Sequence, residues 1–282
     1  MRKGRLAREF IVLRYVTLVF AAAIGAANAA TAQESPAARD WEVLVGGGAL
    51  AAPSYEGDDD YRLSILPSIQ INYRKKFFAS VEGGVGYRVF DTEAFRAGPI
   101  ARVKFERDDD GDQGFAVTGD DTDDLRGLGD VDTSLELGMF AERNVGPVAL
   151  GAEIRKAVTG HEGAVVEFGA RWSGRSLVLG PPVIWSIGPR ARIVDENYNS
   201  AYFGVSPQQS TASGLPVFEA EGGLHSYGLG ASAIVPLSPE WTAVLFAGLD
   251  RLTGDASDNP LVQLRGAENQ GSLGFFLSYR AF

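Results

Sequence analysis

The feature of this sequence that most constrains its fold is an alternation of apolar and polar residues that recurs from residue 41 to the C-terminus. Residues 164–173 show it most clearly, because alanine, valine, phenylalanine and tryptophan alternate there with glutamate, glycine, arginine and serine. Successive side chains of a strand point to opposite faces of a sheet, so this pattern predicts strands with one apolar and one polar face. No helical period competes with it.

Eleven segments carry this strand pattern, and together they predict an all-β protein. They are residues 41–51, 62–74, 77–90, 98–107, 131–142, 148–156, 164–173, 177–194, 217–235, 241–252 and 271–282. A bacterial single-chain barrel has an even number of strands, because both termini lie in the periplasm. We therefore predict an antiparallel transmembrane β-barrel of twelve strands, with ten as the alternative, and expect the missing strand between residues 51 and 128. We interpret Pro181-Pro182 inside one segment as a bulge, since proline removes a ladder donor.

The polar face of these strands decides between a soluble barrel and a membrane barrel. It carries glycines and charges of both signs, which can pair across a narrow lumen, whereas a soluble barrel turns its apolar face inward. The candidate lumen residues are Arg155, Glu167, Arg171, Arg190 and Arg192. Aromatic residues near strand ends are candidates for interfacial girdles: Trp41, Tyr73, Phe77, Tyr87, Trp172 and Trp241. We therefore predict that the apolar face contacts lipid.

The N-terminus predicts export. A basic stretch precedes an apolar run of about ten residues, which is too short for a spanning helix, and two A-x-A sites follow. We predict a signal peptide over residues 1–32, cleaved after Ala32, and a mature barrel over residues 33–282; a retained anchor is the alternative. The chain has no cysteine, which excludes disulfides and thiolate metal sites. Its net charge of -10 argues against nucleic-acid binding.

Much of the negative charge lies in predicted loops. Aspartates gather at residues 58–60, at 108–110 with Asp112, and at 120–121 with 123–124. We interpret these loops as solvated extracellular segments. The alternative is weak binding of divalent cations that also bridge lipopolysaccharide. The segment from Asp108 resembles the start of a calcium loop, but no glutamate closes it at the required spacing.

Two histidines are the only candidates for a histidine base. His161 lies in a tight Gly-rich turn, and His225 lies in a predicted strand; we assign both to structural roles, although a Ser–His pair stays open. No nucleophile elbow or H-E-x-x-H site is present. We predict no catalytic residue, no cofactor and no metal site, and hence no enzyme. Residues 196–216 form a long aromatic-rich segment, which we interpret as a contact surface or an inward plug.

Several short motifs together resemble the MipA/OmpV family of Gram-negative outer-membrane proteins. They include Pro53–Gly57, Leu125–Asp132, Tyr202–Ser210, Ser213–Pro216, Pro236–Pro239, Asn259–Val262 and Ser278–Arg280. The residues taken from these motifs as contact candidates are Pro53, Tyr55, Gly57, Tyr61, Arg126, Gly127, Gly129, Asp130, Tyr202, Phe203, Gly204 and Pro207. Ala281 departs from the family pattern, since it moves the final aromatic residue to the opposite face.

The resemblance implies a non-enzymatic barrel in the outer membrane, bounded by lipid and lipopolysaccharide. Family members are thought to scaffold a lytic murein transglycosylase and a penicillin-binding murein synthase. Phe282 is the expected signal for the barrel-assembly machinery. We expect the periplasmic contact surface at turns such as Asn144–Pro147 and Leu237–Glu240. A narrow solute channel and a surface adhesin are the alternative functions.

Overall fold

A computed structural model describes residues 40–81, 83–109, 116–118, 122–177 and 182–282. The predicted signal peptide and its cleavage site lie outside these residues, as do Asp110, Asp112, Asp120, Asp121 and Pro181. No helix among the described residues has the length and apolarity needed to cross a membrane.

Strands account for most of the described chain. They are β1 (Trp41–Pro53), β2 (Tyr61–Tyr73), β3 (Phe77–Ser80), β4 (Gly84–Tyr87), β5 (Phe90–Asp91), β6 (Phe95–Lys104), β7 (Ala116–Thr118), β8 (Ser134–Val145), β9 (Val148–Ala157), β10 (Ala164–Leu177), β11 (Pro182–Val194), β12 (Gly223–Pro236), β13 (Trp241–Leu252) and β14 (Asn269–Arg280). Four short helices complete the fold: α2 (Glu196–Phe203), α3 (Pro207–Ser213), α4 (Asp255–Asp258) and α5 (Pro260–Arg265).

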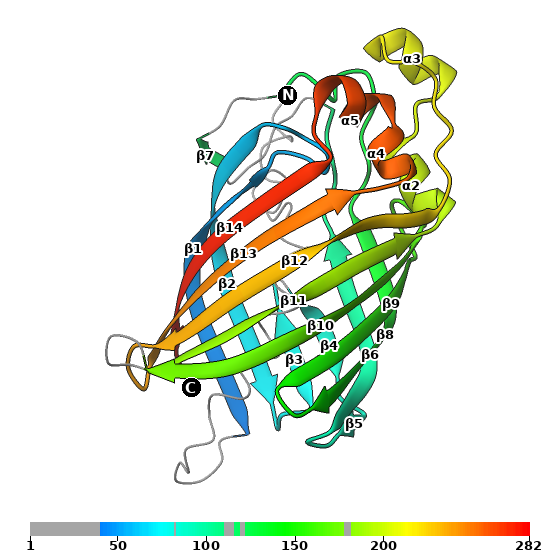
Figure 1. Cartoon of the computed structure of the whole chain (residues 1–282). Coiled ribbons are helices and arrows are strands. Elements are labelled where there is room, and N and C mark those ends of the chain that lie inside the picture. The colour runs from blue at the N-terminus through cyan, green and yellow to red at the C-terminus, as the bar shows by residue number, and fades with distance from the viewer. Residues whose placement is uncertain (1–39, 82, 110–115, 119–121, 178–181) are drawn as a thin grey trace, which may run out of the picture.

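These strands close into one antiparallel barrel (Figure 1). Each long strand pairs with the next along the chain, and β1 pairs with β14 on one side and with β2 on the other. Of the fourteen strands in the described sheet, β5 and β7 lie outside the closed ring, which leaves twelve around the wall. The predicted class and strand number are therefore confirmed.

The twelfth strand comes from the region between residues 51 and 128. Residues 77–90 were expected to form one strand, and this was wrong: β3 and β4 pair with each other as a short hairpin. The chain reverses at Gly84, which has a left-handed φ of 75°, and the Ser80 hydroxyl accepts a bond from the Gly83 amide. Apolar residues keep the same parity on both sides of the turn, so the alternation conceals it. Pro182 begins β11, where proline is tolerated, instead of lying inside a strand.

Side-chain exposure shows which face of the wall meets lipid. On β9, Ile154 is 56% exposed while its neighbour Arg155 is 3% exposed. The same inversion holds around the barrel, with apolar side chains outside and charged side chains inside, as a membrane barrel requires. The lumen is not uniformly polar, however: Leu50, Leu66, Phe246 and Phe276 form a buried apolar cluster on the β1, β2, β13 and β14 side.

The two ends of the barrel differ in their connections (Figure 1). One end holds the β8–β9 and β12–β13 turns, the start of β1 and the end of β14, together with the turn at residues 74–76. The other end holds the loop at residues 54–60 and all four helices. Outer-membrane barrels have short periplasmic turns and longer extracellular loops, which assigns the helical end to the outside. The six aromatic residues expected in girdles all lie toward the periplasmic end. The ring centres of Trp41 and Tyr73 are 4.4 Å apart there.

The seam between the first and last strands depends on glycine. Gly46 and Gly48 of β1 face Ser278 and Phe276 of β14. A Cβ atom on Gly46 would lie 2.1 Å from the carbonyl oxygen of Leu277, and one on Gly48 would lie 2.5 Å from the Phe276 ring. The backbones therefore approach too closely at this seam for any side chain at these two positions.

Candidate functional site

The extracellular mouth of the barrel is covered by a lid, which we define as residues 54–60, 195–222 and 253–268. Helix α2 begins at Glu196, because the Asp195 carboxylate caps it by accepting a bond from the Tyr198 amide at 3.1 Å. Tyr198, Tyr202 and Phe203 on this helix are at most 5% exposed and pack against the upper barrel wall. Helix α2 therefore fits the plug interpretation, whereas α3 in the same segment has no buried residue.

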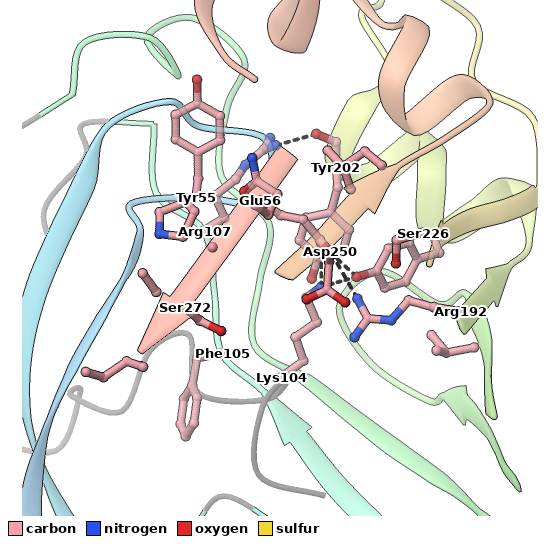
Figure 2. Close-up of a pocket in the computed structure, with 18 of the residues that line it drawn as sticks. Tyr55, Glu56, Lys104, Phe105, Arg107, Arg192, Tyr202, Ser226, Asp250 and Ser272 are labelled. Atoms are coloured by element: carbon pink, nitrogen blue, oxygen red, sulfur yellow. Dashed lines mark hydrogen bonds and ion pairs between the residues drawn. The ribbon is translucent and has the colours of Figure 1, made fainter. Parts of the chain in front are cut away.

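Glu56, in the loop between β1 and β2, ties the lid to the barrel wall (Figure 2). Its carboxylate accepts a bond from Arg192 of β11 at 2.9 Å and one from the Tyr198 hydroxyl at 3.0 Å. The Lys104 ammonium lies 3.4 Å from it and stands 3.9 Å from the centre of the Tyr202 ring. Burial alone raises the pKa of Glu56, but the positive charges of Lys104 and Arg192 hold that pKa well below its usual range.

Below the lid, a chain of ion pairs runs along the inner wall from β8 to β11. Arg155 contacts Glu136 at 2.6 Å and Glu167 at 3.1 Å, and it also pairs with Glu153. Glu167 in turn accepts a bond from Arg192 at 2.7 Å, which joins this network to the lid. Each buried charge thus has a partner of opposite sign, as burial in a low-dielectric interior requires.

The structure places all five lumen candidates inside the barrel. Arg155, Glu167 and Arg192 belong to the network above. Arg190 donates to Asp250 at 2.8 Å, and Arg171 donates to Glu142 at 2.9 Å. Each of these residues was assigned to the lumen because it alternates with apolar residues along its strand.

Both histidines lie in this packed upper region. His161 Nδ1 accepts a bond from the Gly163 amide at 2.9 Å, so its Nε2 carries the proton and donates to Glu136 at 3.0 Å. His225 is fully buried between the rings of Tyr198 and Phe203, each 5.5 Å away. Its Nε2 lies 3.6 Å from Glu56. These contacts are those of packing residues.

Two cavities flank the ion-pair network. The upper one, about 120 Å³, lies between Glu56, Lys104 and Tyr202. The lower one, about 260 Å³, is lined by more arginines than carboxylates. Its charged residues are Arg88, Arg96, Arg102, Arg171, Arg190, Arg192, Glu142, Glu153, Glu167 and Asp250. Six cations against four anions leave the lower cavity with an excess of two positive charges.

The family-motif residues gather at the extracellular end. Tyr55, Tyr202 and Phe203 are buried, and they pack in the apolar clusters of the lid. The remainder form its frame. Pro53 ends β1, and Tyr61 begins β2, where its hydroxyl accepts a bond from the Gly271 amide. Gly57 packs on Val262. Gly204 is the C-cap of α2, and Pro207 begins α3. Gly127 contacts Ala212, and Gly129 has a left-handed φ of 73°. The Asp130 carboxylate accepts a bond from the Asp109 amide, and the exposed Arg126 side chain pairs with Asp123.

A basic turn at the periplasmic end escaped the sequence interpretation. Arg74 and Lys75 connect β2 to β3 with φ values of 49° and 58°, and the Lys76 amide donates to the Tyr73 carbonyl at 3.0 Å. Two central residues with positive φ define a turn that usually takes Asn-Gly, so these long side chains strain it. Arg74 is fixed by two bonds to Asp40, at 3.0 and 2.8 Å. The sequence signal for this turn was a run of three cations at the boundary between the predicted strands 62–74 and 77–90.

The expected periplasmic contact turns lie at this same end. Gly146 and Pro147 link β8 to β9, and Leu237–Glu240 link β12 to β13. Phe282 lies beyond the end of β14 and is 64% exposed.

Comparison with known proteins identifies a family. The family model described as MltA-interacting protein MipA matches residues 45–281. No curated protein sequence matches the chain. Among solved structures, an outer-membrane channel from Pseudomonas putida F1 aligns with 88% of this chain and 100% of its own, at 12% identity and a TM-score of 0.42. The NanC porin aligns with 84% of this chain and 98% of its own, at 9% identity and a TM-score of 0.39.

Proposed function

Because the chain belongs to the MltA-interacting protein MipA family, we propose that it is an outer-membrane scaffold that binds a lytic murein transglycosylase at its periplasmic face. The basic turn of Arg74, Lys75 and Lys76 carries this proposal. It projects Lys75 and Lys76 at the periplasmic end, next to Arg74, whose charge is paired with Asp40. The turn keeps these cations despite the positive φ of Arg74 and Lys75, and strained residues cluster at functional positions. Membrane anchoring then holds the hydrolase near the cell wall, where a penicillin-binding murein synthase can join it.

The lid and the ion pairs below it narrow the lumen, which favours a scaffold over a wide pore. The lid covers the extracellular mouth, and Glu56 fastens it to the wall through Arg192 and Tyr198. The ion pairs of Arg155 lie on the inner wall directly below the lid. Under this proposal, the exposed side chain of Phe282 acts during insertion into the membrane, when the assembly machinery recognises it.

The test is binding of a purified lytic murein transglycosylase to the detergent-solubilised barrel. Lys75→Glu with Lys76→Glu reverses two periplasmic charges, and we expect at least tenfold weaker binding that also falls with added salt. Arg126→Glu is the control, because it reverses an exposed cation at the extracellular end. Unchanged binding by the double variant, or equal loss in the control, contradicts a periplasmic basic docking site.

The lower cavity favours a second candidate, a narrow channel that prefers anions. Its excess of two positive charges lies within the barrel wall, next to Arg190 and Arg192. Planar-bilayer recording decides between the two functions. Discrete channels with anion-selective reversal potentials, lost in Arg190→Gln, identify a channel. A silent bilayer, with insertion verified by heat-modifiable gel migration, leaves the scaffold.

A further inference from the structure

Three consecutive carboxylates meet at the extracellular lip of the barrel. One oxygen from each of Asp58, Asp59 and Asp60 lies within 4.8 Å of the others. Calcium takes oxygen ligands at 2.3–2.6 Å, so two oxygens on opposite sides of one ion are about 5 Å apart. The three carboxylates are therefore close enough together for one ion to reach them all.

The buried member of this group lacks a full set of partners. Asp58 is 0% exposed, and its Oδ1 accepts a bond from the Asp60 amide at 3.1 Å. Its Oδ2 has no hydrogen-bond partner among the described residues. A buried carboxylate oxygen without a donor is costly, which marks a position where a cation would stabilise the protein.

The charges around Asp58 point the same way. The carboxylate of Asp124 adds a fourth negative charge near Asp58, Asp59 and Asp60. The nearby Arg265 guanidinium is engaged elsewhere, because it donates to the backbone carbonyls of Asp124 and Ser213. The local excess is therefore negative, and a divalent cation offsets it.

The loop that carries these carboxylates is already held in place. The Tyr55 hydroxyl donates to the Arg265 carbonyl at 3.1 Å. The Gln270 side chain accepts from the Gly57 amide at 3.2 Å and donates to the Asp58 carbonyl at 3.1 Å. Asp59 and Asp60 remain exposed to the medium. The site thus combines a fixed backbone with access from outside.

We propose that Asp58, Asp59 and Asp60 form a binding site for one calcium-class divalent cation at the extracellular lip. Asp58 also forms a backbone bridge with Gly266, so the site lies where the β1–β2 loop meets the turn before β14. This site is separate from the periplasmic scaffold surface and does not depend on it.

Calorimetric titration of the EDTA-treated, detergent-purified barrel with calcium chloride tests the proposal. Extracellular calcium sites commonly bind with Kd values of about 10⁻⁴–10⁻³ M. We expect one site in that range, weakened at least tenfold in the Asp59→Asn, Asp60→Asn double variant. Both changes are at exposed positions, so the barrel should still fold, and heat-modifiable gel migration checks this.

The matched control removes two exposed lid carboxylates elsewhere, through Glu219→Gln with Glu221→Gln. It should bind calcium as the unmodified protein does. The absence of a binding heat in the unmodified protein overturns the proposal, as does equal weakening in the control, which identifies diffuse attraction to an acidic surface. Asp58→Asn provides an independent reading, because it should weaken binding while altering one atom at the site.

Discussion

The ion-pair network below the lid and the extracellular lip both concentrate charge, but they balance it differently. In the network, Arg155 contacts Glu136, Glu153 and Glu167, so each charge faces an opposite one. At the lip, Asp58 is buried close to Asp59 and Asp60, and burial together with these neighbouring charges raises its pKa. Balanced charge inside the wall maintains the shape of the barrel. Unbalanced charge at an end of the barrel can bind an ion or a protein from outside. The extracellular lip has an excess of negative charge, and the basic periplasmic turn has an excess of positive charge.

Removing the centre of the balanced network should have the largest effect. Arg155→Met leaves three carboxylates around an apolar side chain, and we expect a loss of about 3–5 kcal/mol in the free energy of unfolding. Urea unfolding in detergent measures it. Arg126→Met is the control, since that exposed ion pair should contribute at most about 1 kcal/mol. Equal effects of the two variants would erase the distinction between lumen and rim.

Opening the join between lid and lumen should come next. Glu56→Ala removes the acceptor shared by Arg192, Lys104 and Tyr198, and we expect a loss of about 3 kcal/mol. The loss is smaller than for Arg155, because Arg192 keeps its bond to Glu167. Amide hydrogen exchange should rise in α2 while β9 stays protected. Unchanged exchange in α2 would mean that apolar packing alone closes the lid.

The lip should respond to pH in the opposite sense to a paired carboxylate. The pKa of Asp58 is about 6 in the folded barrel and near 3.8 in the unfolded chain. The folded state therefore binds more protons between these values, and stability falls as pH rises from 4 to 6. We expect the calcium-free protein to lose about 2 kcal/mol across this range relative to Asp58→Asn. Parallel pH profiles for the two proteins would show that Asp58 is ionised without penalty.

The periplasmic turn should show the smallest change in stability. Lys75→Gly removes the side chain from a left-handed position, and we expect a gain of about 1 kcal/mol. The same variant should bind the transglycosylase less tightly, since it deletes one of the three cations. If Lys75→Gly is more stable but binds the transglycosylase as tightly as the unmodified protein, the strained turn is not part of the contact surface.

The sequence predicted the wall well, because alternation is a direct property of strands that separate lipid from lumen. It located Glu167 and Arg192 on the inner face, and the strand register then places them opposite each other. It could not supply the pairing of Arg192 with Glu56, because those residues are 136 positions apart and meet only when the lid closes. The β3–β4 hairpin was missed because its turn preserves the parity of the pattern.

The lid helices were missed for a different reason. None exceeds eight residues, so each is too short for a helical period to stand out against the strand pattern. Local signals were nevertheless present. Ser206, Pro207 and Gln209 form a capping box with proline at the first turn of α3, and Asn259-Pro260 begins α5 in a similar way.

The glycine seam has a consequence for how the barrel is made. Strands β1 and β14 are the first and last of the described strands, and their ladder closes the ring. Gly46 and Gly48 let these two strands come together at a spacing that excludes any side chain. A larger residue at Gly46 should therefore hinder closure, and an unclosed barrel presents two unpaired sheet edges. The same close approach recurs where Gly138 and Gly188 meet carbonyl oxygens of neighbouring strands, so assembly of this wall depends on glycine at several ladders.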